Sequence, residues 1–106
     1  MLDESTFRRH CDAAIEALKK SLIAQEEEDD FEVEEQNGEL NILFAEPPGK
    51  FVITPNTPPR QIWISALSTS FKLDWSETAK AFVLAKTGET LDAVVERVIR
   101  EHLRQA

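Results

Sequence analysis

Residues 31–45 read FEVEEQNGELNILFA, two short runs rich in apolar side chains joined by Asn-Gly. In the first run apolar and acidic side chains alternate, and a period of two is typical of a strand that buries one face. Asn37-Gly38 supplies the positive φ angles that a two-residue type I′ turn needs. The stretch therefore predicts an antiparallel hairpin, whose second strand covers about 40–45.

Four further strands are expected after this hairpin. Each is a short run rich in apolar side chains between turn-forming residues, near 50–54, 61–67, 71–75 and 81–85. The connecting loops are expected at 46–49 and at the polar segment 76–80. Pro55, Pro58 and Pro59 are expected to end the first of these strands, because proline has no backbone N–H to donate to a sheet.

Apolar side chains at helical spacing flank the strand region on both sides. The stripe before it predicts a helix from about Asp3 or Ser5 and consists of Phe7, Cys11, Ile15, Leu18 and Leu22. The stripe after it predicts a helix from about Glu89, with Thr87-Gly88 as its start, and consists of Leu91, Val94, Val95, Val98, Ile99 and Leu103. The sequence thus predicts an α+β fold, a two-layer sandwich with both helices on one face of a five- to six-stranded antiparallel sheet.

Composition limits the number of domains and the kinds of partner. A chain of 106 residues with 42% hydrophobic content suits a single domain over 1–106. Twenty acidic against twelve basic residues give a formal charge of −8, which disfavours nucleic acids and anionic membranes and favours cations and basic protein surfaces.

The cellular compartment is inferred from cysteine content and from the N-terminus. One cysteine excludes an internal disulfide and indicates a reducing compartment. No apolar run is long enough to span a bilayer, and the first residues resemble neither a secretory signal nor a transit peptide. We expect a bacterial cytoplasmic protein; a mature mitochondrial form is the alternative.

Five consecutive acids, Glu26 to Asp30, follow the expected first helix. Acids at this position oppose the partial negative charge at the C-terminal end of a helix. Glu32 and Glu34 on the next strand add to the same negative region, and a bound cation would relieve the repulsion. Carboxylates alone favour a hard cation that is weakly held and hydrated. A solvated connector without a ligand is the other interpretation.

Trp63 is the second candidate for binding. The aliphatic side chains of its strand share one face: Ile62, Ile64 and Ala66. If that face packs on the core, Trp63 points outward together with Gln61 and Ser65. An outward tryptophan is typical of protein-binding surfaces, whereas an indole covered by a neighbouring loop would belong to the core.

No catalytic residue is predicted. The sequence contains no phosphate-binding glycine loop, no G-x-S-x-G and no H-E-x-x-H. Cys11 lies on the apolar stripe of the first helix, so a buried and unreactive thiol is expected. His10 and His102 are isolated in the sequence.

Residues 57–65 read TPPRQIWIS and resemble the T-P-x-x-Q-I-W-L-S signature of the frataxin family. The similarity continues at Asp74-Trp75, at the Asn37-Gly38 turn followed by Leu40, and at Gly88 before the last helix, and so spans nearly the whole chain. The resemblance implies an α/β sandwich, an acidic ridge that binds iron, and a protein-binding sheet surface around the signature tryptophan.

The resemblance and the acid run together give two sets of candidate site residues. The metal set would hold Fe2+ or Fe3+ weakly and exchangeably, and consists of Asp12, Glu26, Glu27, Glu28, Asp29, Asp30, Glu32 and Glu34. The partner set would dock on a cysteine desulfurase and an iron–sulfur scaffold protein, and consists of Asn56, Arg60, Gln61, Trp63 and Ser65.

The sequence departs from the family pattern at a few positions. Lys19 and Lys20 replace an acid pair of the bacterial members, which shifts negative charge toward the following loop and strand. Thr54 stands where an asparagine is usual, with Asn56 two residues later, and Phe82 replaces a tryptophan.

The expected function is that of a non-enzymatic, iron-binding accessory protein of iron–sulfur cluster assembly. One alternative is a ferroxidase that stores iron in oligomers, although di-iron oxidation sites usually add histidine to carboxylates on facing helices. The other is a purely protein-binding regulatory module with incidental metal binding. A monomer that iron could drive into oligomers is expected.

Overall fold

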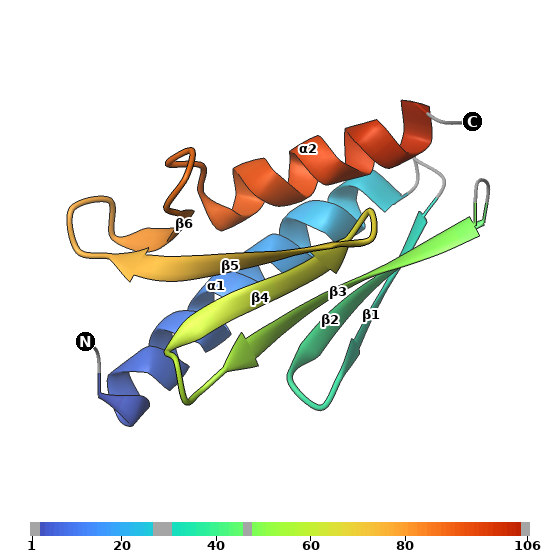
Figure 1. The fold of residues 1–106 in the computed structure, drawn as a ribbon. Coiled ribbons are helices and arrows are strands. Elements are labelled where there is room, and N and C mark those ends of the chain that lie inside the picture. The colour runs from blue at the N-terminus through green and yellow to red at the C-terminus, as the bar shows by residue number, and fades with distance from the viewer. Residues whose placement is uncertain (1–2, 27–30, 46–47, 105–106) are drawn as a thin grey trace.

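A computed structural model describes residues 3–26, 31–45 and 48–104. Six consecutive strands lie between two helices, and both helices pack on the same face of the sheet (Figure 1). The elements are α1 (Glu4–Glu26), β1 (Phe31–Gln36), β2 (Glu39–Ala45), β3 (Pro48–Asn56), β4 (Gln61–Ala66), β5 (Thr69–Ser76), β6 (Ala81–Leu84) and α2 (Leu91–Arg104). The predicted α+β sandwich is confirmed, with six strands.

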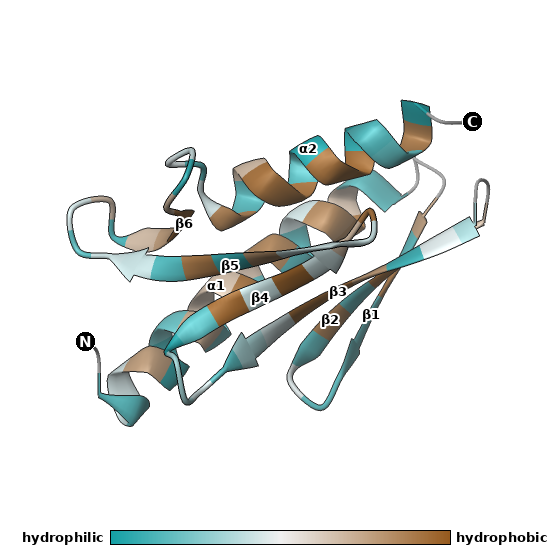
Figure 2. Ribbon diagram, in the orientation of Figure 1, coloured by the Kyte–Doolittle hydropathy of each residue, from teal (hydrophilic) through white to brown (hydrophobic). Residues whose placement is uncertain are grey.

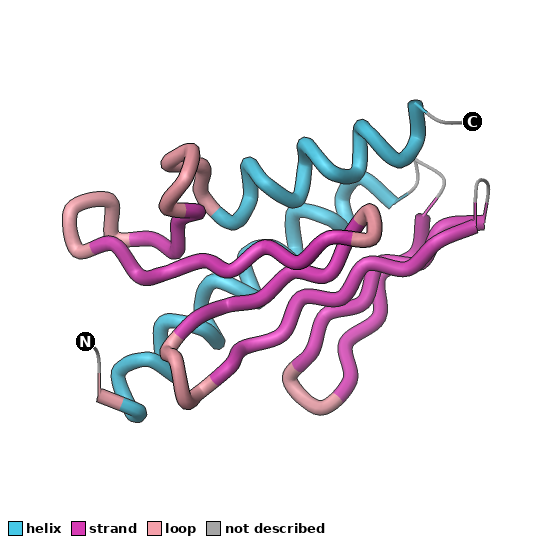
Figure 3. Tube along the Cα trace, in the orientation of Figure 1, coloured by secondary structure: helices cyan, strands magenta, loops and turns pink. Residues whose placement is uncertain are grey.

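Each strand pairs with the next along the chain, so the sheet is an antiparallel meander in the order β1-β2-β3-β4-β5-β6 (Figure 3). The β1–β2 hairpin closes through the pair Gln36 and Glu39, and its turn residues Asn37 and Gly38 have φ angles of 53° and 81°. These positive angles are those of the predicted type I′ turn.

The prediction that prolines end the third strand near residue 54 is wrong for Pro55. This residue lies within β3 and pairs with Ile62 of β4. The ladder between β2 and β3 ends at the pair Leu40 and Ile53, because β2 turns back into the hairpin beyond Glu39. Pro55 therefore lies at a local edge of the sheet, where a missing N–H is tolerated.

The second helix begins at Leu91 and not at Thr87-Gly88. Leu84 N donates to Glu89 O at 2.8 Å, which holds the segment before the helix against the end of β6. Thr90 then serves as the N-cap, because its Oγ1 accepts a hydrogen bond from Ala93 N at 3.3 Å. Gly88, with a φ of 78°, belongs to the turn between the two elements.

The core lies between the sheet and the two helices. All five residues of the predicted α1 stripe are buried, and so are the α2 stripe residues from Leu91 to Ile99, whereas Leu103 is only partly buried. Figure 2 shows the alternation of hydrophobic and hydrophilic bands that this arrangement requires along β4. No helix within the described ranges is long and apolar enough to cross a membrane.

Cys11 is 2% exposed in this core. Burial, with a smaller contribution from the Asp12 carboxylate, raises the pKa of its thiol to about 12. The thiol is therefore protonated at neutral pH and unreactive, as its place on the apolar stripe predicts.

Candidate functional site

Trp63 lies on the face of the sheet that points away from the helices, which we call the outer face. Its neighbours Ile62 and Ile64 are 0% and 1% exposed and face the helices, so strand parity places the indole on the opposite side. In the register of the sheet, Trp63 stands between Thr54 on β3 and Lys72 on β5. The indole is half-buried, so it is not sealed inside the core.

Side chains on β4 and on the adjacent strand β5 hold the indole in one orientation. Trp63 Nε1 donates to Gln61 Oε1 at 2.8 Å, and Gln61 Nε2 donates to Asp74 Oδ1 at 3.0 Å. Lys72 Nζ lies 4.8 Å from the centre of the indole ring, a cation–π distance. The outer face thus carries an ordered aromatic platform, the Trp63 platform, formed by Trp63, Gln61, Lys72 and Asp74.

The other residues of the predicted partner set lie beside this platform. Asn56 and Gln61 pair across β3 and β4, and Arg60 lies in the turn between these strands with a φ of 55°. Ser65 is exposed two positions beyond Trp63. The structure therefore brings these five positions together along β3, β4 and their turn.

The described acids of the predicted metal set lie on different surfaces. Glu32 and Glu34 are exposed on the outer face of β1, whereas Asp12 is exposed on α1. Glu27, Glu28, Asp29 and Asp30 lie outside the described residues. Within residues 3–26, 31–45 and 48–104, no group of three or more His, Cys, Asp and Glu side chains is arranged to hold a metal ion.

Glu26 already has a structural partner. Its Oε2 accepts a hydrogen bond from the backbone N–H of Val33 at 2.8 Å. Val33 belongs to β1, the edge strand of the sheet, so this carboxylate covers one of the donors that an edge strand leaves unpaired. A cation bound by Glu26 would have to share its carboxylate with this bond.

Asp12 lines a hollow between α1 and the β1–β2 hairpin. Glu16 and Glu35 line the same hollow, two acids that the sequence analysis did not single out. Lys19 forms an ion pair with Glu35 at 3.0 Å, and this hydrogen bond raises the pKa of Lys19. Lys19 therefore neutralises part of this acidic region.

Asn41 is a polar residue of the site region that sequence reasoning missed. It lies on the outer face of β2 and is 4% exposed, and its Oδ1 is buried without a hydrogen-bond partner in the described part of the chain. Its position between the apolar residues Leu40 and Ile42 was the only signal that the sequence offered.

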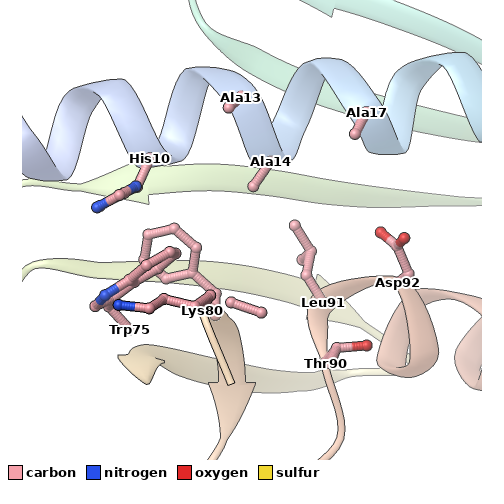
Figure 4. Close-up of a pocket in the computed structure, with 11 residues that line it drawn as sticks. His10, Ala13, Ala14, Ala17, Trp75, Lys80, Thr90, Leu91 and Asp92 are labelled. Atoms are coloured by element: carbon pink, nitrogen blue, oxygen red, sulfur yellow. The ribbon is translucent and has the colours of Figure 1, made fainter. Parts of the chain in front are cut away.

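A hollow of about 450 Å³ opens on the helix side, between α1, β6 and the start of α2 (Figure 4). His10 stacks on Trp75 at one end, with 3.8 Å between ring centres, and Asp92 lies at the opposite end. Burial, helped by Glu96, raises the pKa of Asp92. Ala13, Ala14 and Ala17 of α1 line one side of the hollow, and Leu91 lies across from them (Figure 4). The described residues that line it include no serine or cysteine nucleophile.

The proteins that are similar in sequence to this chain agree with one another in family. A family model described as Frataxin-like domain matches residues 1–105. The chain is 30% identical over 100 residues to the iron-sulfur cluster assembly protein CyaY of Pseudomonas putida strain GB-1, covering 94% of this chain and 88% of that protein. For the protein of the same name from Azotobacter vinelandii, identity is 26% over 91 residues, with 84% and 82% covered.

A solved structure has a similar fold. The frataxin from Psychromonas ingrahamii superposes with a TM-score of 0.73 at 19% identity, covering 94% of this chain and 90% of that chain. The predicted sandwich and the predicted family are therefore both confirmed.

Proposed function

Since the chain belongs to the frataxin family, we propose that it is an iron-binding accessory protein of iron–sulfur cluster assembly. It binds Fe2+ or Fe3+ weakly through acidic side chains and docks on a cysteine desulfurase and its scaffold protein through the outer face. The relatives reported above are bacterial proteins, and we propose the bacterial cytoplasm as its location.

The observation that carries the docking role is the Trp63 platform. A tryptophan held in place before binding loses little conformational entropy when a partner covers it. The carbonyl oxygen of Gln61 accepts the indole N–H, and one hydrogen of its amide group is donated to Asp74. The second amide N–H of Gln61 is left for a partner. The platform thus offers an aromatic surface, a cation and a hydrogen-bond donor side by side.

The iron-binding role is supported by charge and by donor chemistry. Glu32 and Glu34 form no side-chain hydrogen bond or ion pair within the described residues, so their carboxylates are available to a cation. Exposed carboxylates bind hard cations without displacing all of their water. Weak, exchangeable binding follows, which suits delivery or sensing of iron better than storage.

A purely protein-binding module is the second candidate. It is favoured by the contrast between the ordered Trp63 platform and the described acids, which are spread over α1 and β1. In that case metal binding would be incidental to docking.

Replacement of Trp63 by alanine tests the docking role. Loss of a central aromatic contact typically weakens a protein complex by about thirtyfold or more. We expect that loss for Trp63→Ala in calorimetric titration against the desulfurase–scaffold complex from the same organism. Leu103→Ala, which truncates a partly buried apolar side chain on α2, is the control and should leave the affinity unchanged. Equal affinities for Trp63→Ala and the unmodified protein would refute docking through this face.

A further inference from the structure

Asn41 Oδ1 is the one buried side-chain polar atom without a hydrogen-bond partner among residues 3–26, 31–45 and 48–104. Leaving such an acceptor unpaired in the folded state is unfavourable relative to its hydration in the unfolded chain. A leucine or valine at this position would avoid that cost. An orphaned acceptor of this kind calls for a ligand, an ion or a water molecule.

The surroundings of Asn41 on the outer face are acidic on one side. Glu34 lies directly opposite on β1, and Glu39 lies two residues earlier on the same strand and face. Directly opposed residues in an antiparallel pair have Cβ atoms about 4.5–5.5 Å apart, so side chains at these positions can share one ligand. Glu32, diagonal to Asn41, adds a further carboxylate.

These carboxylates are not neutralised by neighbouring bases. No ion pair within the described part of the chain involves Glu32, Glu34 or Glu39. On the β3 side Asn41 faces Val52, which can neither donate to its oxygen nor compensate the acids, and the nearest base on this face is Lys50, paired with Leu43. The polar atom that lacks a donor therefore lies beside carboxylates that lack a counter-charge.

One bound cation would both pair with the unpaired Asn41 oxygen and neutralise the carboxylates beside it. Amide carbonyl and carboxylate oxygens are the donors that hard divalent cations prefer, and such ions complete their shell with water. We propose that Asn41 Oδ1, Glu34 and Glu39 bind a hydrated divalent cation on the outer face of the β1–β2 hairpin. Glu34 is exposed, so its side chain can change rotamer to admit the ion without movement of the strands.

This inference rests on the proposed metal-binding function and assigns to it two donors on β2, which are distinct from the acid run that follows α1. It places a cation on the same face as the Trp63 platform. The proposed site is also separate from Asp12, which lines the hollow between α1 and the β1–β2 hairpin.

Manganese tests the site, because Mn2+ prefers oxygen donors and its unpaired electrons broaden nearby NMR signals. In a titration of 15N-labelled protein with substoichiometric Mn2+, we expect the amide signals of Glu34, Glu39 and Asn41 to broaden first. Asn41→Leu should weaken Mn2+ binding at these positions about tenfold, as expected for loss of one ligand to a charged species. Asn41→Asp keeps an oxygen donor and adds charge, so this variant should retain Mn2+ binding.

Two controls keep folding and metal binding apart. Asn41→Leu removes the orphaned acceptor and should melt no lower than the unmodified protein, whereas Asn41→Asp should melt lower and recover when Mn2+ is added. Ser70→Ala removes an exposed hydroxyl on the outer face of β5 and should change neither measurement.

The outcomes separate this inference from the function on which it rests. Broadening confined to residues 26–32 and unchanged in Asn41→Leu would overturn the Asn41 site and leave the acidic ridge intact. An absence of specific broadening with both Mn2+ and Fe2+ would overturn the metal-binding function itself.

Discussion

Gly49 on β3 lies against the buried ring of His102 on α2. A Cβ atom at Gly49 would be 2.6 Å from His102 Cε1, far closer than a normal contact. The imidazole cannot easily retreat, because its centre lies 4.2 Å from that of Phe44 and 5.6 Å from that of Phe51. We expect Gly49→Ala to lower the free energy of unfolding by about 1–3 kcal/mol, measured by urea denaturation.

A double-mutant cycle distinguishes this clash from an effect on the backbone of β3. His102→Ala removes the ring that the added methyl group would meet, so Gly49→Ala should cost much less in that background. If Gly49→Ala lowered the free energy of unfolding equally with and without the His102 ring, the glycine would be needed for a reason other than this clash.

Single residues differ in how far the sequence reveals their surroundings. The outward direction of Trp63 follows from the parity of apolar residues in its strand, and the burial of Cys11 follows from its helical stripe. The hydrogen bond from Val33 N to Glu26 and the orphaned oxygen of Asn41 depend on which elements meet in space. Sequence spacing carries no information on such contacts.

At the scale of elements, periodicity predicts which segments are helix or strand, and tertiary contacts set where they end. β3 runs on through Pro55 because β2 has already turned away, which the sequence of β3 alone does not show. α2 starts later than expected because the turn before it pairs with β6 through Val83 and Thr90. Both errors lie at element ends, where hydrogen bonds to neighbours compete with local preference.

An ion pair holds the segment that leads into α2. Arg97 Nε and Nη2 donate to the two carboxylate oxygens of Glu89 at 2.9 and 3.0 Å. The hydrogen bond from Arg97, and then that from Thr87, lower the pKa of Glu89 below its ordinary value of 4.5. The carboxylate is therefore bound more favourably in the folded protein than in the unfolded chain, and only while it is ionised.

The pH dependence of this pair follows from the direction of the shift. Because the folded pKa lies below the unfolded one, the stabilisation is complete above about pH 4.5 and disappears as pH falls through the folded pKa. We expect the coupling between Glu89→Gln and Arg97→Ala, measured by thermal unfolding in a double-mutant cycle, to be largest at neutral pH and to weaken progressively as the pH is lowered below 4.5. A coupling that stays constant with pH would assign the stabilisation to packing of the arginine stem.

At the scale of the whole molecule, the two candidate surfaces share one face of the sheet. The helices cover the other face, so the outer face of all six strands is left for partners (Figure 1). Its β1–β2 side carries the acids and Asn41, and its β3–β5 side carries the Trp63 platform. With a formal charge of −8, the molecule repels acidic surfaces and attracts basic ones over several ångströms.

This division of the outer face predicts that its two sides act at different stages of docking. Exposed charges mainly steer the approach of a partner, whereas a buried aromatic contact mainly slows dissociation. In surface-binding kinetics with the desulfurase–scaffold complex, Glu32→Lys with Glu34→Lys should lower the association rate about tenfold at low salt and much less at high salt. Trp63→Ala should raise the dissociation rate and leave the salt dependence of association unchanged. If the lysine double variant associated at the normal rate at low salt, the acids of β1 would have no part in steering, and their charge would serve cation binding alone.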